Sequence, residues 1–70
     1  MEIIYLRDEF IKLGQALKAA GFVESGGEAK EVIQEAKVLV NGEVDTRRGR
    51  KLYEGDVVSF ENQTIEIKKL

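Results

Sequence analysis

With 70 residues, no cysteine, no histidine and a formal net charge of −2, the chain is limited to one small domain, residues 1–70, without disulfides. The missing residue types remove the usual base near neutral pH, the usual thiol nucleophile and the usual zinc ligands, so we expect no enzymatic activity, cofactor, metal site or small-molecule substrate. No apolar run approaches the roughly 18 residues of a membrane span and the N-terminus lacks signal-peptide features, so we expect a cytoplasmic protein with no membrane partner.

The first elements expected along the chain are a strand and a helix. Ile3–Leu6 is a short apolar run whose isoleucines and tyrosine favour a strand. Asp8 and Glu9 break this run and suit the first turn of a helix, because acidic side chains favour helix N-termini. Apolar residues then recur at three- and four-residue spacing up to Gly21, as expected for one helix face: Phe10, Leu13, Leu17 and Ala20.

A second helix is expected to begin at Ser25. Ser25 and Glu28 have the spacing of a capping box, in which hydroxyl and carboxylate each accept a hydrogen bond from a free backbone amide. The apolar face follows at Ala29, Val32, Ile33 and Ala36. The Gly26–Gly27 pair is either a flexible helix entrance or an anion-binding group of backbone amides; its spacing matches no nucleotide-binding motif.

From Val38 the hydrophobic period changes to two, which predicts strands. Val38–Val40 and Glu43–Asp45 flank Asn41-Gly42, a pair that favours a tight type I′ hairpin turn. Leu52 and Tyr53 return to the core, and two further strands are expected at Val57–Phe60 and Thr64–Ile67. The predicted order is β-α-α-β-β-β-β, an α+β fold in which two helices pack on a small, mainly antiparallel sheet of four to five strands.

A concentrated positive charge follows the hairpin. The segment Arg47-Arg48-Gly49-Arg50-Lys51 carries four positive charges, whereas the chain outside Thr46–Tyr53 has seven Lys and Arg against thirteen Asp and Glu, a balance of −6. A polyanion close to such a loop is attracted by the local positive charge of the loop, although the net charge of the whole chain is negative. We expect an exposed loop whose arginines spread around a phosphate backbone and whose substitution changes stability by no more than about 0.5 kcal/mol. The alternative is a merely solvated loop.

From Ser25 to Val58 the sequence resembles the S-four RNA-binding domain, named after the fourth small-subunit ribosomal protein. The residues that match its pattern, in order, are Leu13, Gly21, Ser25, Ala29, Lys30, Ile33, Val38, Val40, Asn41, Gly42, Gly55, Asp56 and Val58. The run from Thr46 to Leu52 is similar to that of the small stand-alone bacterial members, the YaaA/YbcJ type. Two positions depart from the pattern: Gly26 stands where arginine is frequent, and Ala36 replaces a glycine that often ends the second helix, where we expect Lys37 to turn the chain instead.

The resemblance implies an alpha-L RNA-binding motif and a non-catalytic module for structured RNA, with ribosomal RNA or a ribosomal subunit as the expected partner in ribosome assembly or translation. The RNA-facing residues that it implies are Ser25, Gly27, Lys30, Lys37, Arg47, Arg48, Arg50 and Lys51. Because four of the five aromatic residues lie in apolar segments, we expect core packing for the aromatic residues, with Tyr53 beside the basic loop as the one for which this is left open, and we expect recognition by RNA shape rather than by base stacking. The alternative function is a protein-interaction adaptor whose basic loop docks an acidic protein partner. We expect a monomer.

Overall fold

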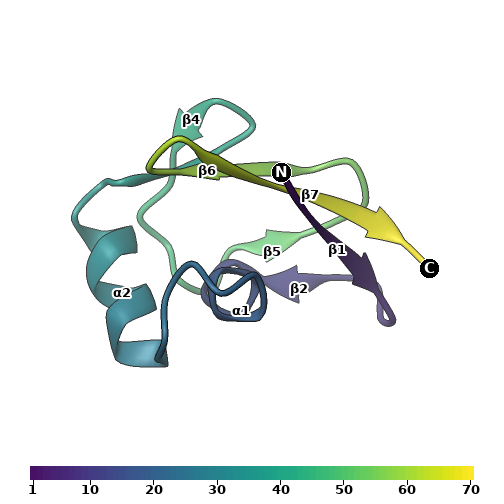
Figure 1. Ribbon diagram of the computed structural model, residues 1–70, viewed down its shortest axis with the longest axis horizontal. Helices are drawn as coiled ribbons and strands as arrows, with labels where there is room; N and C mark the ends of the chain where they lie inside the picture. Colours follow the sequence, from purple (N-terminus) through teal and green to yellow (C-terminus); the bar gives the residue numbers. More distant parts are fainter.

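The computed structural model describes all residues, 1–70, and contains two helices and seven strands (Figure 1). In chain order the elements are β1 (Glu2–Leu6), β2 (Ile11–Lys12), α1 (Leu13–Ala19), α2 (Gly26–Gln34), β3 (Val38–Val40), β4 (Glu43–Val44), β5 (Lys51–Leu52), β6 (Val57–Phe60) and β7 (Gln63–Lys69). Both helices lie on the same side of the main sheet (Figure 1). Neither helix is long and apolar enough to cross a membrane.

The main sheet has five strands in the order β1-β7-β6-β3-β4. Three of its four pairings are antiparallel, and the β1–β7 pairing is parallel, with Ile4 opposite Ile67. The predicted α+β class and the mainly antiparallel sheet are therefore confirmed. The sequence reading did not include the separate two-stranded ribbon β2–β5, in which Ile11 lies opposite Leu52.

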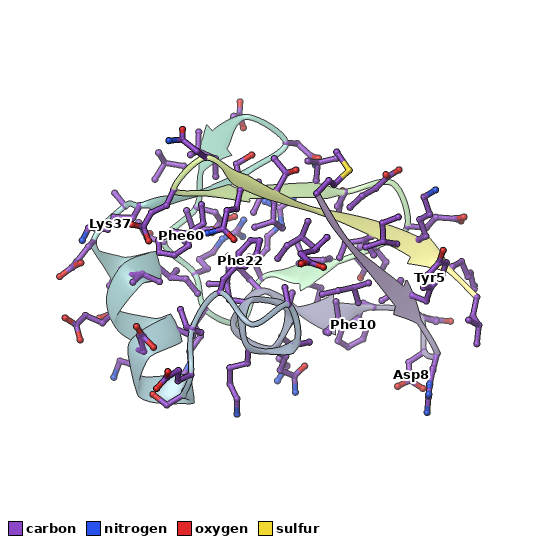
Figure 2. All side chains as sticks on the ribbon, in the orientation of Figure 1. Tyr5, Asp8, Phe10, Phe22, Lys37 and Phe60 are labelled. Atoms are coloured by element: carbon purple, nitrogen blue, oxygen red, sulfur yellow. The ribbon has the colours of Figure 1, made fainter.

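The core lies between the helices and the inner face of the sheet. Leu13 and Leu17 of α1 and Ile33 of α2 are fully buried there, as the three- and four-residue spacing predicts. The strands contribute alternate residues to the same core: Val38, Val40, Val58, Phe60, Ile65 and Ile67. Figure 2 shows Phe60 in this interior and the partly buried Phe22 packed against it, with the two ring centroids 6.4 Å apart.

The start of α1 differs from the prediction. Residues 7–9 form a bend, and the helix begins at Leu13 instead of at Asp8 and Glu9. Its first amides are satisfied from elsewhere in the chain, because Leu13 N–H donates to the Arg50 carbonyl (2.8 Å) and Gly14 N–H donates to the Arg48 carbonyl (3.1 Å). The helix thus begins where the basic loop supplies acceptors for its free N–H groups.

The start of α2 confirms the cap at Ser25. The Ser25 hydroxyl accepts a hydrogen bond from Glu28 N–H at 3.1 Å. The reciprocal half of the predicted capping box is wrong, because the Glu28 carboxylate accepts from Glu24 N–H (2.8 Å), one residue before the cap. The carboxylate still satisfies a free amide at the helix entrance.

Both helices end with the same hydrogen-bond pattern around a left-handed residue. At the end of α1 that residue is Gly21, with φ of 78°, as predicted. At the end of α2 it is Ala36, with φ of 62°, so the expectation that Lys37 turns the chain is wrong. Ala36 N–H donates to Ile33 O (3.1 Å) and Lys37 N–H donates to Val32 O (3.2 Å), the two bonds of a Schellman motif. An alanine therefore occupies a position that favours glycine.

The predicted hairpin turn is confirmed. Asn41 and Gly42 both have positive φ, 53° and 86°, as a type I′ turn requires. The Asn41 side chain also holds the start of β6, because its Oδ1 accepts from Val57 N–H (2.9 Å) and its Nδ2 donates to Asp56 Oδ1 (3.0 Å). This turn fixes the strands from which the basic loop emerges.

Candidate nucleic-acid interface

A buried carboxylate holds part of the basic loop, Arg47–Lys51. Asp45 is only 6% exposed. Its Oδ1 accepts from the Arg47 backbone N–H (2.9 Å) and from Arg47 Nε (3.1 Å), and its Oδ2 accepts from Arg47 Nη2 (2.8 Å) and Arg50 Nη1 (2.7 Å). The hydrogen bonds from Arg47 hold the pKa of the Asp45 carboxyl far below its usual range, against the opposing effect of burial.

The expectation that all the loop arginines spread freely is therefore wrong for Arg47 and Arg50. Their substitution is also expected to cost more than the 0.5 kcal/mol of an ordinary surface change, because it leaves Asp45 buried without partners. The effect is expected to be smaller for Arg47, whose side chain is 70% exposed and screened by solvent, than for Arg50, whose side chain is 29% exposed.

Arg48 occupies a different position from its neighbours. Its side chain lies against Gly14 of α1, where an added Cβ would come within 2.7 Å of the Arg48 Cγ. No acidic side chain pairs with Arg48, whereas Arg47 and Arg50 both pair with Asp45. Glycine at position 14 thus gives Arg48 room to lie over the first turn of α1.

Arg48 forms one wall of an open hollow of about 320 Å³, which we call the basic hollow. It is lined by residues of β2, α1, α2 and the basic loop: Lys12, Gly14, Gln15, Lys18, Gly26, Ala29, Arg48 and Gly49. Its three cations, Lys12, Lys18 and Arg48, form no salt bridge, since the three ion pairs of the structure involve only Lys37, Arg47 and Arg50 as cations. Three free positive charges on three separate elements suit a phosphate backbone.

Lys51 adds a fourth cation beside the basic hollow. In the β2–β5 ribbon Lys51 lies directly opposite Lys12. Like charges in that arrangement repel each other, which costs some stability and raises the local positive potential. The Lys51 ammonium lies 4.8 Å from the centroid of the Phe10 ring, where the ring face attracts it.

The N-terminal turn of α2 completes the basic hollow on its third side. Gly26 lines the hollow, and the first amides of a helix have no acceptor within that helix. No atom would lie within 4 Å of a Cβ added to Gly26. Having glycine instead of the family's frequent arginine at this position therefore leaves open space beside the hollow. These amides and the helix dipole add partial positive charge next to the three cations.

The structure brings together some of the predicted site residues and separates others. Lys30 is exposed one turn beyond Gly26 and has no ion pair, whereas the Ser25 hydroxyl is engaged in the helix cap and Gly27 is exposed beside it. Lys37 lies at the far end of α2 (Figure 2) and pairs with Glu35 at 3.0 Å, a contact that raises the Lys37 pKa. Lys37 is thus not part of the basic hollow.

Two lysines of the basic hollow were missed by the sequence reading. Lys12 and Lys18 flank Gln15 at intervals of three residues: Lys12 is the last residue of β2, directly before α1, while Gln15 and Lys18 lie on successive turns of α1. That spacing is visible in the sequence, but the resemblance implies RNA-facing residues only on the second helix and the loop. Tyr5 differs from the expected core position, because it is 53% exposed, and Tyr53, whose position was left open, is 48% exposed.

A family model described as the S4 domain matches residues 4–68. The chain is 57% identical over 58 residues to the probable ribosome maturation protein RlbA of Bacillus subtilis, covering 83% of this chain and 82% of that protein. It is 39% identical over 57 residues to the putative RNA-binding protein YbcJ of Escherichia coli, covering 81% of each. The solution structure of Escherichia coli YbcJ, described as revealing an alpha-L motif involved in RNA binding, matches with a TM-score of 0.74 and 35% identity over 97% of this chain and 87% of that one. The resemblance and fold expected from the sequence are thereby confirmed.

Proposed function

Since this chain belongs to the S4 domain family, we propose that it is a non-catalytic protein that binds structured ribosomal RNA during ribosome maturation. The ribosomal target is suggested by RlbA, which is named as a probable ribosome maturation protein and shares 57% identity with this chain. The RNA partner is supported by YbcJ, which is named as a putative RNA-binding protein and shares 39% identity with this chain. We infer a cytoplasmic location, because the relatives that support the proposal come from bacteria, whose ribosomes are assembled in the cytoplasm.

The observation that carries the proposal is the basic hollow. Lys12, Lys18 and Arg48 converge there without acidic partners, in a chain whose net charge is −2. A cation that neutralises an RNA phosphate releases a condensed counterion, and this release drives binding. With three to five contacts, counting Lys51 and Lys30, we expect the logarithm of the binding constant to fall against the logarithm of salt concentration with a slope of about −2 to −4.5.

The lining of the basic hollow favours the RNA backbone over single bases. Ala29 is the one apolar residue that lines the basic hollow. The lining includes no aromatic side chain on which a base would stack. Structured RNA is recognised largely through the arrangement of its phosphates and riboses, which a concave polar surface complements. We therefore assign recognition to the shape of a folded RNA, such as a helix or a junction.

The test is association of the protein with ribosomal particles before and after nuclease treatment. We expect the tagged protein to sediment with ribosomal particles and to be released by ribonuclease, and crosslinking followed by sequencing to recover ribosomal RNA. Association that survives complete ribonuclease digestion would instead support the alternative of a basic loop docked on an acidic protein. Recovery of RNA without enrichment of ribosomal RNA would contradict the proposed target.

A further inference from the structure

We propose that Asp45 is a positioning residue of the RNA-binding surface, because its carboxylate withdraws Arg47 and Arg50 from phosphate contact and fixes the loop so that Arg48 faces the basic hollow. This inference rests on the proposed function, since it concerns how the same surface is built. It divides the basic loop into a structural half and a contact half, whereas the sequence suggests four equivalent cations.

The carboxylate reaches both ends of the loop turn. Asp45 binds the backbone N–H and the guanidinium of Arg47, and it also binds the guanidinium of Arg50. Between these two arginines the chain makes a turn, closed by Arg50 N–H donating to Arg47 O at 3.1 Å. Asp45 is 6% exposed and Arg50 is 29% exposed, so these two residues lie at the root of the loop. The Arg47 side chain is 70% exposed and is held by its two hydrogen bonds to Asp45 rather than by burial.

The same turn connects to the opposite wall of the basic hollow. The carbonyls of Arg48 and Arg50 accept the first two amide hydrogens of α1, those of Gly14 and Leu13. Lys12 immediately precedes these amides, and Lys18 lies further along the same helix. A loop held by Asp45 therefore holds α1 as well, and the distance between Arg48 and the two lysines is set before RNA arrives. Such preorganisation favours binding because less side-chain and loop freedom is lost in the complex.

Charge and position predict opposite effects when Asp45 is neutralised. If Asp45 acts only through its charge, Asp45→Asn makes the loop more positive, so RNA binding becomes tighter and more sensitive to salt. If Asp45 positions the loop, the variant frees Arg47 and Arg50, and binding becomes weaker although positive charge is gained. Ordering two or three side chains again in the complex corresponds to a loss of roughly 5- to 20-fold in affinity.

Glu43 offers a matched control on the same hairpin. It is exposed and makes no side-chain hydrogen bond or ion pair, so Glu43→Gln removes one negative charge without releasing any arginine. We would titrate the wild type, Glu43→Gln, Asp45→Asn and Asp45→Glu with one ribosomal RNA fragment at several salt concentrations. We expect Glu43→Gln to bind as tightly as the wild type or slightly more tightly, Asp45→Asn to bind about 5- to 20-fold more weakly, and Asp45→Glu to recover part of the loss.

Asp45→Asn binding as tightly as Glu43→Gln, with the wild type binding normally, would overturn the positioning role and leave the proposed function intact. A wild type that binds no structured RNA would overturn both. Should Asp45→Asn fail to fold, the mobility of the arginine Nε–H groups of the wild type, measured by nuclear magnetic resonance with and without RNA, tests the positioning role. We expect Arg47 Nε–H to be as rigid as the backbone in the free protein and unchanged by RNA, while Arg48 Nε–H responds to RNA. An Arg47 side chain as mobile as that of Arg48 would overturn the inference.

Discussion

Replacing Ala36 by glycine is expected to stabilise the protein, because Ala36 ends α2 in a left-handed conformation with φ of 62°. In that conformation the Cβ of an L-residue approaches the following carbonyl oxygen, at a cost of about 1–2 kcal/mol. Glycine avoids this contact but loses more conformational freedom on folding, which offsets about 0.4–1 kcal/mol. Position 36 is exposed, so the lost methyl group removes little packing. The net gain is about 0.5–1 kcal/mol.

The other helix provides the reverse experiment within the same protein. Gly21 ends α1 with φ of 78° and the same two hydrogen bonds, and no atom lies within 4 Å of a Cβ added there. Gly21→Ala is therefore expected to destabilise the protein by a similar amount, through the backbone alone. For a domain of this size 1 kcal/mol corresponds to roughly 4–8 °C in melting temperature.

Urea unfolding followed by circular dichroism measures both effects. We expect Ala36→Gly to raise the unfolding midpoint, Gly21→Ala to lower it, and the dependence on urea concentration to remain unchanged. The double variant should return close to the wild type, because the two sites lie on different helices and share no partner. A neutral or destabilising effect of Ala36→Gly beside a destabilising Gly21→Ala would refute the strain assigned to Ala36.

Three further substitutions test the loop and its supports. Because folding lowers the pKa of Asp45, the ionised carboxylate stabilises the folded protein above about pH 4, the pKa of an Asp in the unfolded chain, and this stabilisation is lost as the pH falls further. Asp45→Asn should therefore make the free energy of unfolding, measured with urea, depend less on pH on the acid side. An unchanged pH dependence would contradict this. Gly14→Ala should displace the Arg48 side chain and weaken RNA binding without loss of the helical circular dichroism signal. Undiminished affinity would contradict the role given to the position of Arg48 against Gly14. Asn41→Ala should lower the free energy of unfolding by about 1–2 kcal/mol, because it removes the acceptor of Val57 N–H at a position with positive φ, while the folded fraction should bind RNA normally.

The parts of the fold that the sequence predicts are those determined by local chemistry. The Ser25 cap, the Asn41-Gly42 turn and the glycine after the first helix each follow from residues within a few positions of one another. The cap and turn conformations depend on these neighbouring residues, so propensity and spacing are sufficient to predict them, whereas the bonds of the Asn41 side chain to Asp56 and Val57 join distant segments and were not predicted. The strand alternation that buries Ile65 and Ile67 is local in the same sense.

The start of α1 and the basic hollow depend on contacts between distant segments. The acidic pair at Asp8 and Glu9 suggests a helix start, but the acceptors for the first helical amides are carbonyls of the basic loop, far along the chain. Those same contacts bring Lys12 and Lys18 to Arg48. The role of Asp45 was also hidden, because in the sequence it is simply an acidic residue before a basic run. Charge counts place a cation on a loop but do not tell which side chains are already paired.

The most direct test of the basic hollow as an RNA phosphate site is a salt titration of single alanine variants against one structured ribosomal RNA fragment. We expect Lys12→Ala, Lys18→Ala and Arg48→Ala each to weaken binding similarly for RNAs of different sequence and to make the salt slope shallower by about 0.7–0.9. Lys69→Ala removes an equally unpaired cation outside the hollow and should leave both quantities unchanged. Equal slopes for the wild type and all three hollow variants would contradict the assignment of RNA binding to this surface.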